Sequence, residues 1–278
     1  MAPVTEFTIP SGQARLAAQA CGHGPAVVLL HAGVADARMW SEQLAALASS
    51  HRAVAYDRRG FGGSLHADEP YSRVGDLLAV LDAVSPSSRA ILVGCSQGGR
   101  IAIDTALAHP QRVRALVLVA PALSGAPQVD SFPEPIQALV DELERAEASG
   151  DIDRLNALEA HAWLDGPTAV PGRVGGAARE LFLAMNGIAL RAQPRGTEIQ
   201  PASAADRLPQ IQVPTLLLWG DLDFPHLQAR CDSMAAQLPK VRCEVLQGTA
   251  HLPNLEQPER FNRSLLAFCE SLPPCIEH

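Results

Sequence analysis

The chain has 278 residues, of which 47% are hydrophobic, and a formal net charge of −8 at pH 7. This length and apolar content predict one α/β domain with an insertion, or alternatively two small domains, and argue against wholesale disorder. Lys240 is the only lysine and no basic run stands out. Nucleic acid is therefore not expected as a partner, because binding a phosphate backbone requires a basic surface.

The amino terminus and the cysteines bear on localisation. The opening segment, MAPVTEFTIPSGQARL, has no charged start followed by an apolar run, so no signal peptide is predicted. The longest apolar stretches, such as AVVLLHA, are too short to cross a bilayer. A cytoplasmic location is predicted, and the sequence leaves the oligomeric state open. The cysteines form no C-x-x-C pair, which disfavours a zinc ribbon and favours buried thiols in a reducing cytoplasm; they are Cys21, Cys95, Cys231, Cys243, Cys269 and Cys275.

The first 121 residues have an alternating pattern of strands and helices. Residues 14–20 and the short segment before them resemble an opening hairpin. Short apolar runs follow, namely AVVLLH, AVAYD, AILVGC and VRALVLVA, and they alternate with helical patterns over residues 37–48, 73–84 and 97–108. Strands buried on both faces lose the in-out alternation of side chains. The pattern therefore predicts an α/β fold: a mostly parallel sheet covered by helices on both faces.

This pattern breaks after Pro121. The following segment contains no strand-like run, but it has amphipathic patterns over residues 134–148, 152–164 and 177–192. Turns rich in proline and glycine separate them, as in DGPTAVPGRVGG. Short helices joined by turns are therefore predicted.

The α/β pattern then returns with TLLLWG, a helix near residues 227–237, RCEVLQG and a final helix near 258–271 that begins at Pro258. An α/β core interrupted by a helical insertion is the simplest account. The predicted segments are the first part of the core, residues 1–121, a helical cap insertion, 122–206, and the second part of the core, 207–278.

The stretch VGCSQGGRIAI places Ser96 between two glycines where a predicted strand meets a predicted helix. A bare G-x-S-x-G is weak evidence, because about one chain in ten of this length would contain it by chance. The context is stronger: a serine in a sharp strand-to-helix turn needs small residues two before and two after it, here Gly94 and Gly98. Such a turn lifts the hydroxyl above the sheet and directs a helix N-terminus at whatever it attacks. Ser96 is therefore predicted to be a nucleophile.

A nucleophilic serine needs a base, and the base needs an orienting acid. In open α/β sheets the active residues lie beyond the carboxyl ends of the strands. Asp221 and Asp223 follow one predicted strand, and His251 follows the next. The order Ser, Asp, His is that of α/β-hydrolases and differs from that of two other serine-hydrolase folds. His251 is the predicted base, because His226 adjoins Asp223 too closely in sequence to serve both partners.

The negative charge that forms on an attacked carbonyl needs two backbone N–H donors. Gln97, the residue after the nucleophile, would provide one. The loop HAGVAD would provide the other, with Val34 as the favoured donor. His31 is expected to support this loop by hydrogen bonding and to take no part in catalysis.

Together these residues resemble the α/β-hydrolase superfamily over nearly the whole chain. The matching segments are HAGVADARMW, YDRRGFGGS, GCSQGG, GDLD and GTAHLPNLEQPERF. The resemblance implies Ser96 as nucleophile, His251 as base and Asp223, which ends the G-[DE]-x-D motif, as acid. In the family the segment YDRRGFGGS corresponds to a structural turn, and no catalytic role is predicted for it. It also implies oxyanion donors at Val34 and Gln97 and a helical cap at roughly 122–206.

Some residues depart from the common pattern of the family. Ala32 stands where many members have glycine, which bears on whether esters of bulky alcohols fit. Cys95 stands where members often have His or Asn, and it is expected to be a small residue packed beneath the turn. Gln97 replaces the tryptophan of members similar to proline iminopeptidases and argues against that activity. Ser96 excludes the chemistry of members with an aspartate nucleophile.

The predicted function is a serine hydrolase that cleaves small carboxylic esters or lactones through an acyl-enzyme, without metal or organic cofactor. The expected partner is thus a small-molecule ester or lactone. The alternatives on the same fold are hydrolysis of enol-lactones or carbon–carbon bonds, cofactor-free perhydrolysis, and a ligand sensor with a retained triad.

The segment ARELFLAMNGIAL bears on substrate choice. Leu181, Met185 and Ile188 can share one helical face there. This face is predicted to line an apolar acyl pocket, or alternatively to pack only within the cap.

Overall fold

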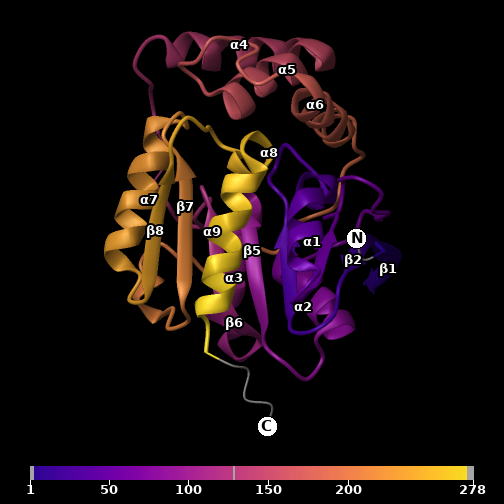
Figure 1. Cartoon of the computed structure of the whole chain (residues 1–278). Coiled ribbons are helices and arrows are strands. Elements are labelled where there is room, and N and C mark those ends of the chain that lie inside the picture. The colour runs from indigo at the N-terminus through magenta and orange to yellow at the C-terminus, as the bar shows by residue number, and fades with distance from the viewer. Residues whose placement is uncertain (1–2, 128, 274–278) are drawn as a thin grey trace.

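A computed structural model describes residues 3–127 and 129–273 (Figure 1). One eight-stranded sheet forms its centre, in the order β1-β2-β4-β3-β5-β6-β7-β8. The strand β2 is antiparallel to both neighbours, and the other adjacent pairs are parallel. The predicted mostly parallel α/β sheet is thus confirmed. The strands are β1 Thr5–Ser11, β2 Ala14–Cys21, β3 Ala26–Leu30, β4 Arg52–Tyr56, β5 Ala90–Cys95, β6 Val113–Val119, β7 Thr215–Gly220 and β8 Val241–Leu246.

Helices cover both faces of the sheet. Val28 and Leu30 of β3 belong to a cluster with side chains of α2, α3 and α7, whereas Val27 and Leu29 belong to another with side chains of α1 and α9. Burial of one aliphatic side chain stabilises the folded state by about 1.5–3 kcal/mol. The continuous apolar strands therefore bind the helices on both faces of the sheet. These helices are α1 Ser41–Leu47, α2 Arg73–Val84, α3 Gln97–Ala108, α7 Pro225–Gln237 and α9 Pro258–Ser271; shorter ones are η1 Ala37–Trp40, η2 Pro110–Arg112, η4 Leu208–Gln210 and α8 Pro253–Glu256.

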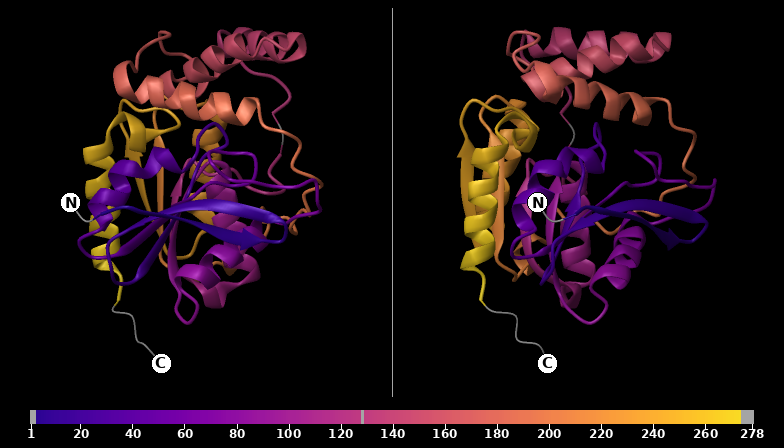
Figure 2. Two further views of the ribbon diagram at one scale, coloured as in Figure 1. Left: turned by 90° about the vertical axis from the view of Figure 1, so that its right-hand side faces the viewer. Right: turned by 45° about the vertical axis from the view of Figure 1, so that its right-hand side comes forward.

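Between β6 and β7 the chain forms a separate helical layer over the carboxyl ends of the strands (Figure 1, Figure 2). Ile136, Leu139 and Ala162 of this layer pack with Phe224 and Leu227, which belong to the segment after β7. This small apolar cluster joins the layer to the core beneath it. The helices of the layer are α4 Ile136–Ser149, α5 Ile152–Ala160, the π-helical turn η3 His161–Asp165 and α6 Gly176–Leu190.

The chain after α6 returns along the core. The Ile199 N–H donates to the Tyr71 carbonyl at 2.7 Å, and Ala204 is buried in the same apolar cluster as α2 and α3. The helical layer over the carboxyl ends of the strands therefore consists of residues 136–190, while residues 199–206 pack against the core.

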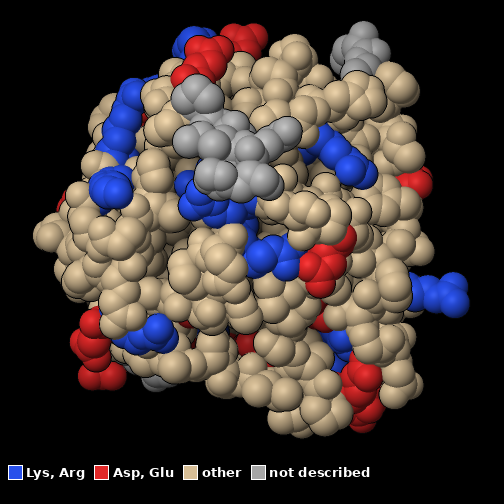
Figure 3. All heavy atoms as spheres, turned by 90° about the horizontal axis from the view of Figure 1, so that it is seen from below, with Lys and Arg blue, Asp and Glu red and all other residues tan. Residues whose placement is uncertain are grey.

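On the face opposite the helical layer, acidic and basic side chains are interspersed among uncharged ones (Figure 3). Within the described residues no helix is long and apolar enough to cross a bilayer. Cys95, Cys231 and Cys269 are buried as predicted, but Cys243 is exposed because it lies on β8, the edge strand of the sheet. Cys275 lies outside the described residues.

Candidate active site

Ser96 occupies the turn between β5 and α3 with φ 51° and ψ −114°. A residue with a side chain adopts this region at a cost of about 1–3 kcal/mol, so the surroundings must hold it there. The Ser96 N–H donates to the Val119 carbonyl at 2.9 Å. A Cβ on Gly94 would lie 2.4 Å from the Gly98 carbonyl oxygen, and one on Gly98 would lie 2.2 Å from the Leu30 carbonyl oxygen. Both glycines are required by these close approaches.

The first residue of α3 is Gln97. The first N–H groups of a helix have no partner within it, and they carry the positive end of the helix dipole. The Gln97 N–H therefore lies at an electropositive helix terminus immediately after Ser96.

His251 and Asp223 form a buried pair. The imidazole Nδ1 lies 2.7 Å from Asp223 Oδ2, and the two residues are 2% and 3% exposed. The other carboxylate oxygen accepts from the Phe224 N–H at 2.8 Å, which fixes the carboxylate. An Nδ1–H bonded to a carboxylate leaves Nε2 as the acceptor nitrogen of a neutral imidazole.

The two halves of the candidate site meet through Cys95. Its Sγ lies 3.6 Å from the His251 carbonyl oxygen, so the residue before Ser96 contacts the backbone of His251. Burial raises the pKa of the Cys95 thiol, as suits a small residue packed beneath the turn. In the described structure no hydrogen bond joins Ser96 to His251. Bonds of this kind often tighten only when substrate binds.

Asp221, the other carboxylate after β7, has a different partner. Its Oδ1 accepts from the Gly248 N–H at 2.6 Å, which ties the loop after β7 to the loop after β8. The two carboxylates thus have different partners: Asp221 accepts from a backbone amide, and Asp223 binds the imidazole of His251.

The candidate oxyanion loop connects β3 to η1. In the described structure the Val34 N–H donates to no protein acceptor. His31 Nε2 accepts from the Arg58 N–H at 3.0 Å, and Nδ1 lies 2.7 Å from the Ala32 carbonyl oxygen. Burial, reinforced by the Arg58 charge, lowers the pKa of His31 well below its usual value. The imidazole is neutral and supports the loop.

The segment YDRRGFGGS, which the sequence suggested to be structural, also supplies a polar contact to the site. Arg58 Nη1 donates to Gln97 Oε1 at 3.0 Å, and Arg73 Nη1 donates to the same oxygen at 3.2 Å. Arg58 is 4% exposed, and burial lowers its pKa to about 9. Sequence reasoning missed this network, because an arginine in a tight turn gives no sign that it points inward.

Trp163 was also missed. It lies in η3 of the helical layer, and its ring centroid is 4.8 Å from that of His251. Its ring also packs on Phe224 at 4.9 Å. The helical layer thus covers the imidazole with an aromatic side chain.

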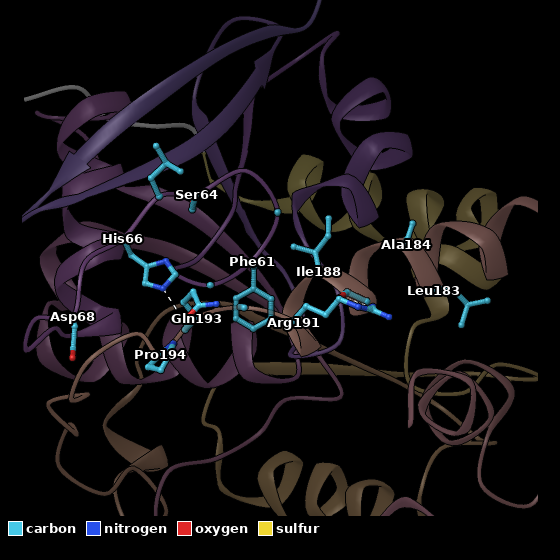
Figure 4. A pocket seen from close by; sticks show the side chains of 15 residues that line it. Phe61, Ser64, His66, Asp68, Leu183, Ala184, Ile188, Arg191, Gln193 and Pro194 are labelled. Carbon is cyan, nitrogen blue, oxygen red and sulfur yellow. Dashed lines mark hydrogen bonds between the residues drawn. The ribbon is translucent and has the colours of Figure 1, made fainter. Parts of the chain in front are cut away.

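A cavity of about 990 Å³ lies between α6 and the loop of residues 60–68 (Figure 4). Ile188 lines it together with Phe61 and Leu183. The other two predicted pocket residues are placed elsewhere: Met185 is buried in the apolar core, and Leu181 packs against the same cluster. Phe61 also contacts His31, with ring centroids 4.7 Å apart. Phe61 thus links the wall of the cavity to the candidate oxyanion loop, although the residues that line the cavity do not include Ser96, Gln97 or His251.

Arg173 joins the helical layer to the loop that carries His251. Its guanidinium donates to the carbonyl oxygens of Leu164 at 2.9 Å and Gly248 at 3.0 Å, and it pairs with Glu256. Glu256 in turn accepts from the Ala250 N–H at 2.8 Å. Burial raises the pKa of Glu256 to about 7, against the opposing effect of Arg173.

Replacing Arg173 with methionine is expected to destabilise the fold by about 2 kcal/mol at pH 8.5, because buried Glu256 loses its partner. Without Arg173 the pKa of Glu256 rises further above its unfolded value. Ionising Glu256 in the folded variant then costs more free energy than in the wild type, and the variant loses stability relative to the wild type as the pH rises above 7. At pH 6, about one unit below this pKa, Glu256 is mostly protonated in both proteins, so the difference should fall to about 1 kcal/mol, from the lost carbonyl contacts. Urea denaturation at the two pH values measures this.

The matched control is Arg154→Met in the same layer. Arg154 and Glu142 form an ion pair with 58% and 42% of their side chains exposed. Its loss should cost less than about 0.5 kcal/mol at both pH values. Equal destabilisation of Arg173→Met at pH 6 and pH 8.5 would contradict the assigned role of Glu256.

Comparison with known proteins adds to this geometry. The sequence profile of the alpha/beta hydrolase family matches residues 27–264. The pimeloyl-[acyl-carrier protein] methyl ester esterase of Aeromonas hydrophila is 27% identical over 246 residues, which cover 86% of this chain and 93% of that protein. Carboxylesterase YbfK of Bacillus subtilis is 25% identical, over 92% of this chain and 84% of that protein. The solved structure of Est816, described as an N-acyl homoserine lactone degrading enzyme, matches with a TM-score of 0.73 and 26% identity, over 94% of this chain and all of that one.

Proposed function

Because this chain belongs to the alpha/beta hydrolase family, we propose that it hydrolyses small carboxylic esters or lactones through an acyl-enzyme. The observation that carries the proposal is the buried contact of 2.7 Å between His251 and Asp223, on loops beside the positive-φ residue Ser96. Similarity to proteins named as esterases and to a lactone-degrading enzyme supports the substrate class.

In the proposed reaction Ser96 Oγ attacks the carbonyl carbon while His251 Nε2 takes its proton. Asp223 stabilises the imidazolium that results. The carbonyl oxygen becomes an oxyanion and accepts hydrogen bonds from the N–H groups of Val34 and Gln97. The intermediate collapses as His251 protonates the departing alcohol oxygen, which leaves an acyl group on Ser96.

The second half of the reaction restores the enzyme. His251 removes a proton from water, whose oxygen attacks the acyl carbon to form a second oxyanion. This intermediate collapses as the bond between the acyl carbon and Ser96 Oγ breaks, the His251 imidazolium returns its proton to Ser96 Oγ, and the carboxylic acid is released. No metal or organic cofactor takes part in this scheme. Within the predicted insertion, residues 122–206, we assign the helices of residues 136–190 as a cap that places Trp163 over the imidazole and limits the access of water.

Hydrolysis of p-nitrophenyl esters from acetate to dodecanoate, together with a set of lactones, tests this function. The cavity beside α6 is expected to accept the acyl chain, so kcat/KM should rise from acetate to medium chains. Each added methylene should lower the free energy of the transition state by up to about 0.8 kcal/mol. A flat or falling profile would contradict the assignment of the cavity. Very slow turnover of every ester would instead favour a ligand sensor.

Ile188→Asp should lower kcat/KM for the longer esters by about tenfold relative to that for acetate, because it places a charge on the wall of the cavity. Val170→Asp is the matched control. Val170 is also an exposed apolar residue of the cap, 78% exposed, and does not line this cavity. An equal response of the two variants would show that Ile188 does not contact the acyl chain.

A further inference from the structure

The side-chain amide of Gln97 is fixed in one orientation. Its oxygen accepts from Arg58 at 3.0 Å and from Arg73 at 3.2 Å. A guanidinium has only donors, so both arginines require an oxygen at that position. The chemistry of the two neighbours therefore decides which way the carboxamide faces.

The opposite edge of the amide is then a donor. A Cβ added at Gly33, in the candidate oxyanion loop, would lie 2.8 Å from Gln97 Nε2. In the described structure this nitrogen donates to no protein acceptor, and it does not belong to the buried polar atoms without a partner. Gln97 as a whole is only partly buried. An accessible pair of N–H bonds thus lies next to Gly33, on the residue that follows Ser96.

The charges behind this amide favour an electron-rich ligand. Arg73 is paired with Glu198 at 2.7 Å, but Arg58 has no carboxylate within 4 Å in the described part of the chain. Arg58 instead donates to Gln97 and, at 2.9 Å, to the Ala32 carbonyl oxygen. Hydrogen bonds in series polarise one another, so a guanidinium on the oxygen strengthens the N–H donors at the far end.

We propose that the Gln97 side chain is a specificity-determining donor for a second oxygen acceptor in the acyl part of the substrate. The inference rests on the proposed function. The Gln97 N–H would bind the oxygen of the scissile carbonyl, and its side-chain amide extends three carbons from the same residue. A carbonyl oxygen a similar number of bonds from the scissile carbon, as in a β-keto ester, matches this reach.

Methyl acetoacetate and methyl butyrate form a matched pair of substrates, since they differ only by the keto oxygen. The wild type should favour methyl acetoacetate. In Gln97→Met the ratio of their kcat/KM values should fall by about 2- to 13-fold, as expected for one hydrogen bond. Gln97→Glu should lose the preference as well, because a carboxylate can accept from both arginines but donates nothing. An unchanged ratio in both variants would overturn the inference.

Arg112→Met is the control for the loss of a polar group. Arg112 pairs with Asp82 on the surface at 2.6 Å and makes no contact with Gln97. The ratio for this variant should equal that of the wild type. A fall as large as that of Gln97→Met would mean that the ratio reports general stability, and it too would overturn the inference.

Binding separates this inference from the proposed function. In a Ser96→Ala background, the Kd values of the two esters can be measured by ligand-observed NMR, with Gln97 intact and with Gln97→Met. Tighter binding of methyl acetoacetate that disappears in Gln97→Met supports the inference even if the wild type hydrolyses neither ester, a result that would refute only the proposed function. Hydrolysis of both esters without selectivity in binding would refute only the inference.

Discussion

Replacing Ser96 with alanine is expected to lower kcat by at least about 10⁴-fold while the protein remains folded. The change removes the attacking oxygen and leaves the backbone contacts of the turn with Val119 and Ala122 in place. Hydrolysis of p-nitrophenyl butyrate measures the loss, and circular dichroism with a thermal melt checks the fold.

A fluorophosphonate probe gives an independent readout of the same residue. It should modify the wild type at Ser96, identified by peptide mass spectrometry, and fail on Ser96→Ala. Ser41→Ala is a control, because the Ser41 hydroxyl bonds only the Arg38 carbonyl oxygen at the start of α1. Labelling that persists in Ser96→Ala would show that another residue is the nucleophile.

Asp223→Asn should lower kcat by about 10²–10⁴-fold. The nucleophile and the oxyanion donors remain, but an amide cannot stabilise the imidazolium of His251 or hold its tautomer as a carboxylate does. Asp221→Asn provides the matched comparison. Asp221 accepts from the Gly248 N–H, and an asparagine oxygen can still accept that bond, so its loss of activity should stay below about tenfold.

Measuring kcat for the two variants under the same conditions decides between the carboxylates. Sequence position left both available, since both follow β7. The family motif pointed to Asp223, and an aspartate directly after a strand tends to cap backbone amides, as Asp221 does. A larger loss for Asp221→Asn would mean that the orienting acid was assigned to the wrong residue.

The framework of the fold could be predicted from the sequence because its signals are local. The helices α2, α3 and α9 begin and end at the residues that the pattern gave. At α2 the Ser72 hydroxyl caps the helix by accepting from the Gly75 N–H, and at α9 Pro258 is the first residue. Buried strands such as β5 appear as continuous apolar runs because both of their faces are covered.

Contacts between segments far apart in the chain could not be predicted. Arg58, Gln97 and Arg73 lie in three different segments, and nothing in their local sequence shows that they meet. Trp163 is one amphipathic residue among several in the cap, and the π-helical turn that directs it at His251 has no sequence signal. The rotation of α6 is similar: its pattern allowed Met185 to face a pocket, whereas tertiary packing buries it in the core.

The order of the strands along the chain has a consequence for biosynthesis. The turn that holds Ser96 is made by β5, α3 and β6, whereas Asp223 and His251 follow β7 and β8, on the far side of the insertion. A chain that grows from its N-terminus therefore contains the complete serine turn well before the ribosome has made the base. On the proposed mechanism such a nascent chain is hydrolytically silent. Activity begins only when the last two strands join the sheet, which makes turnover itself a reporter of completed folding.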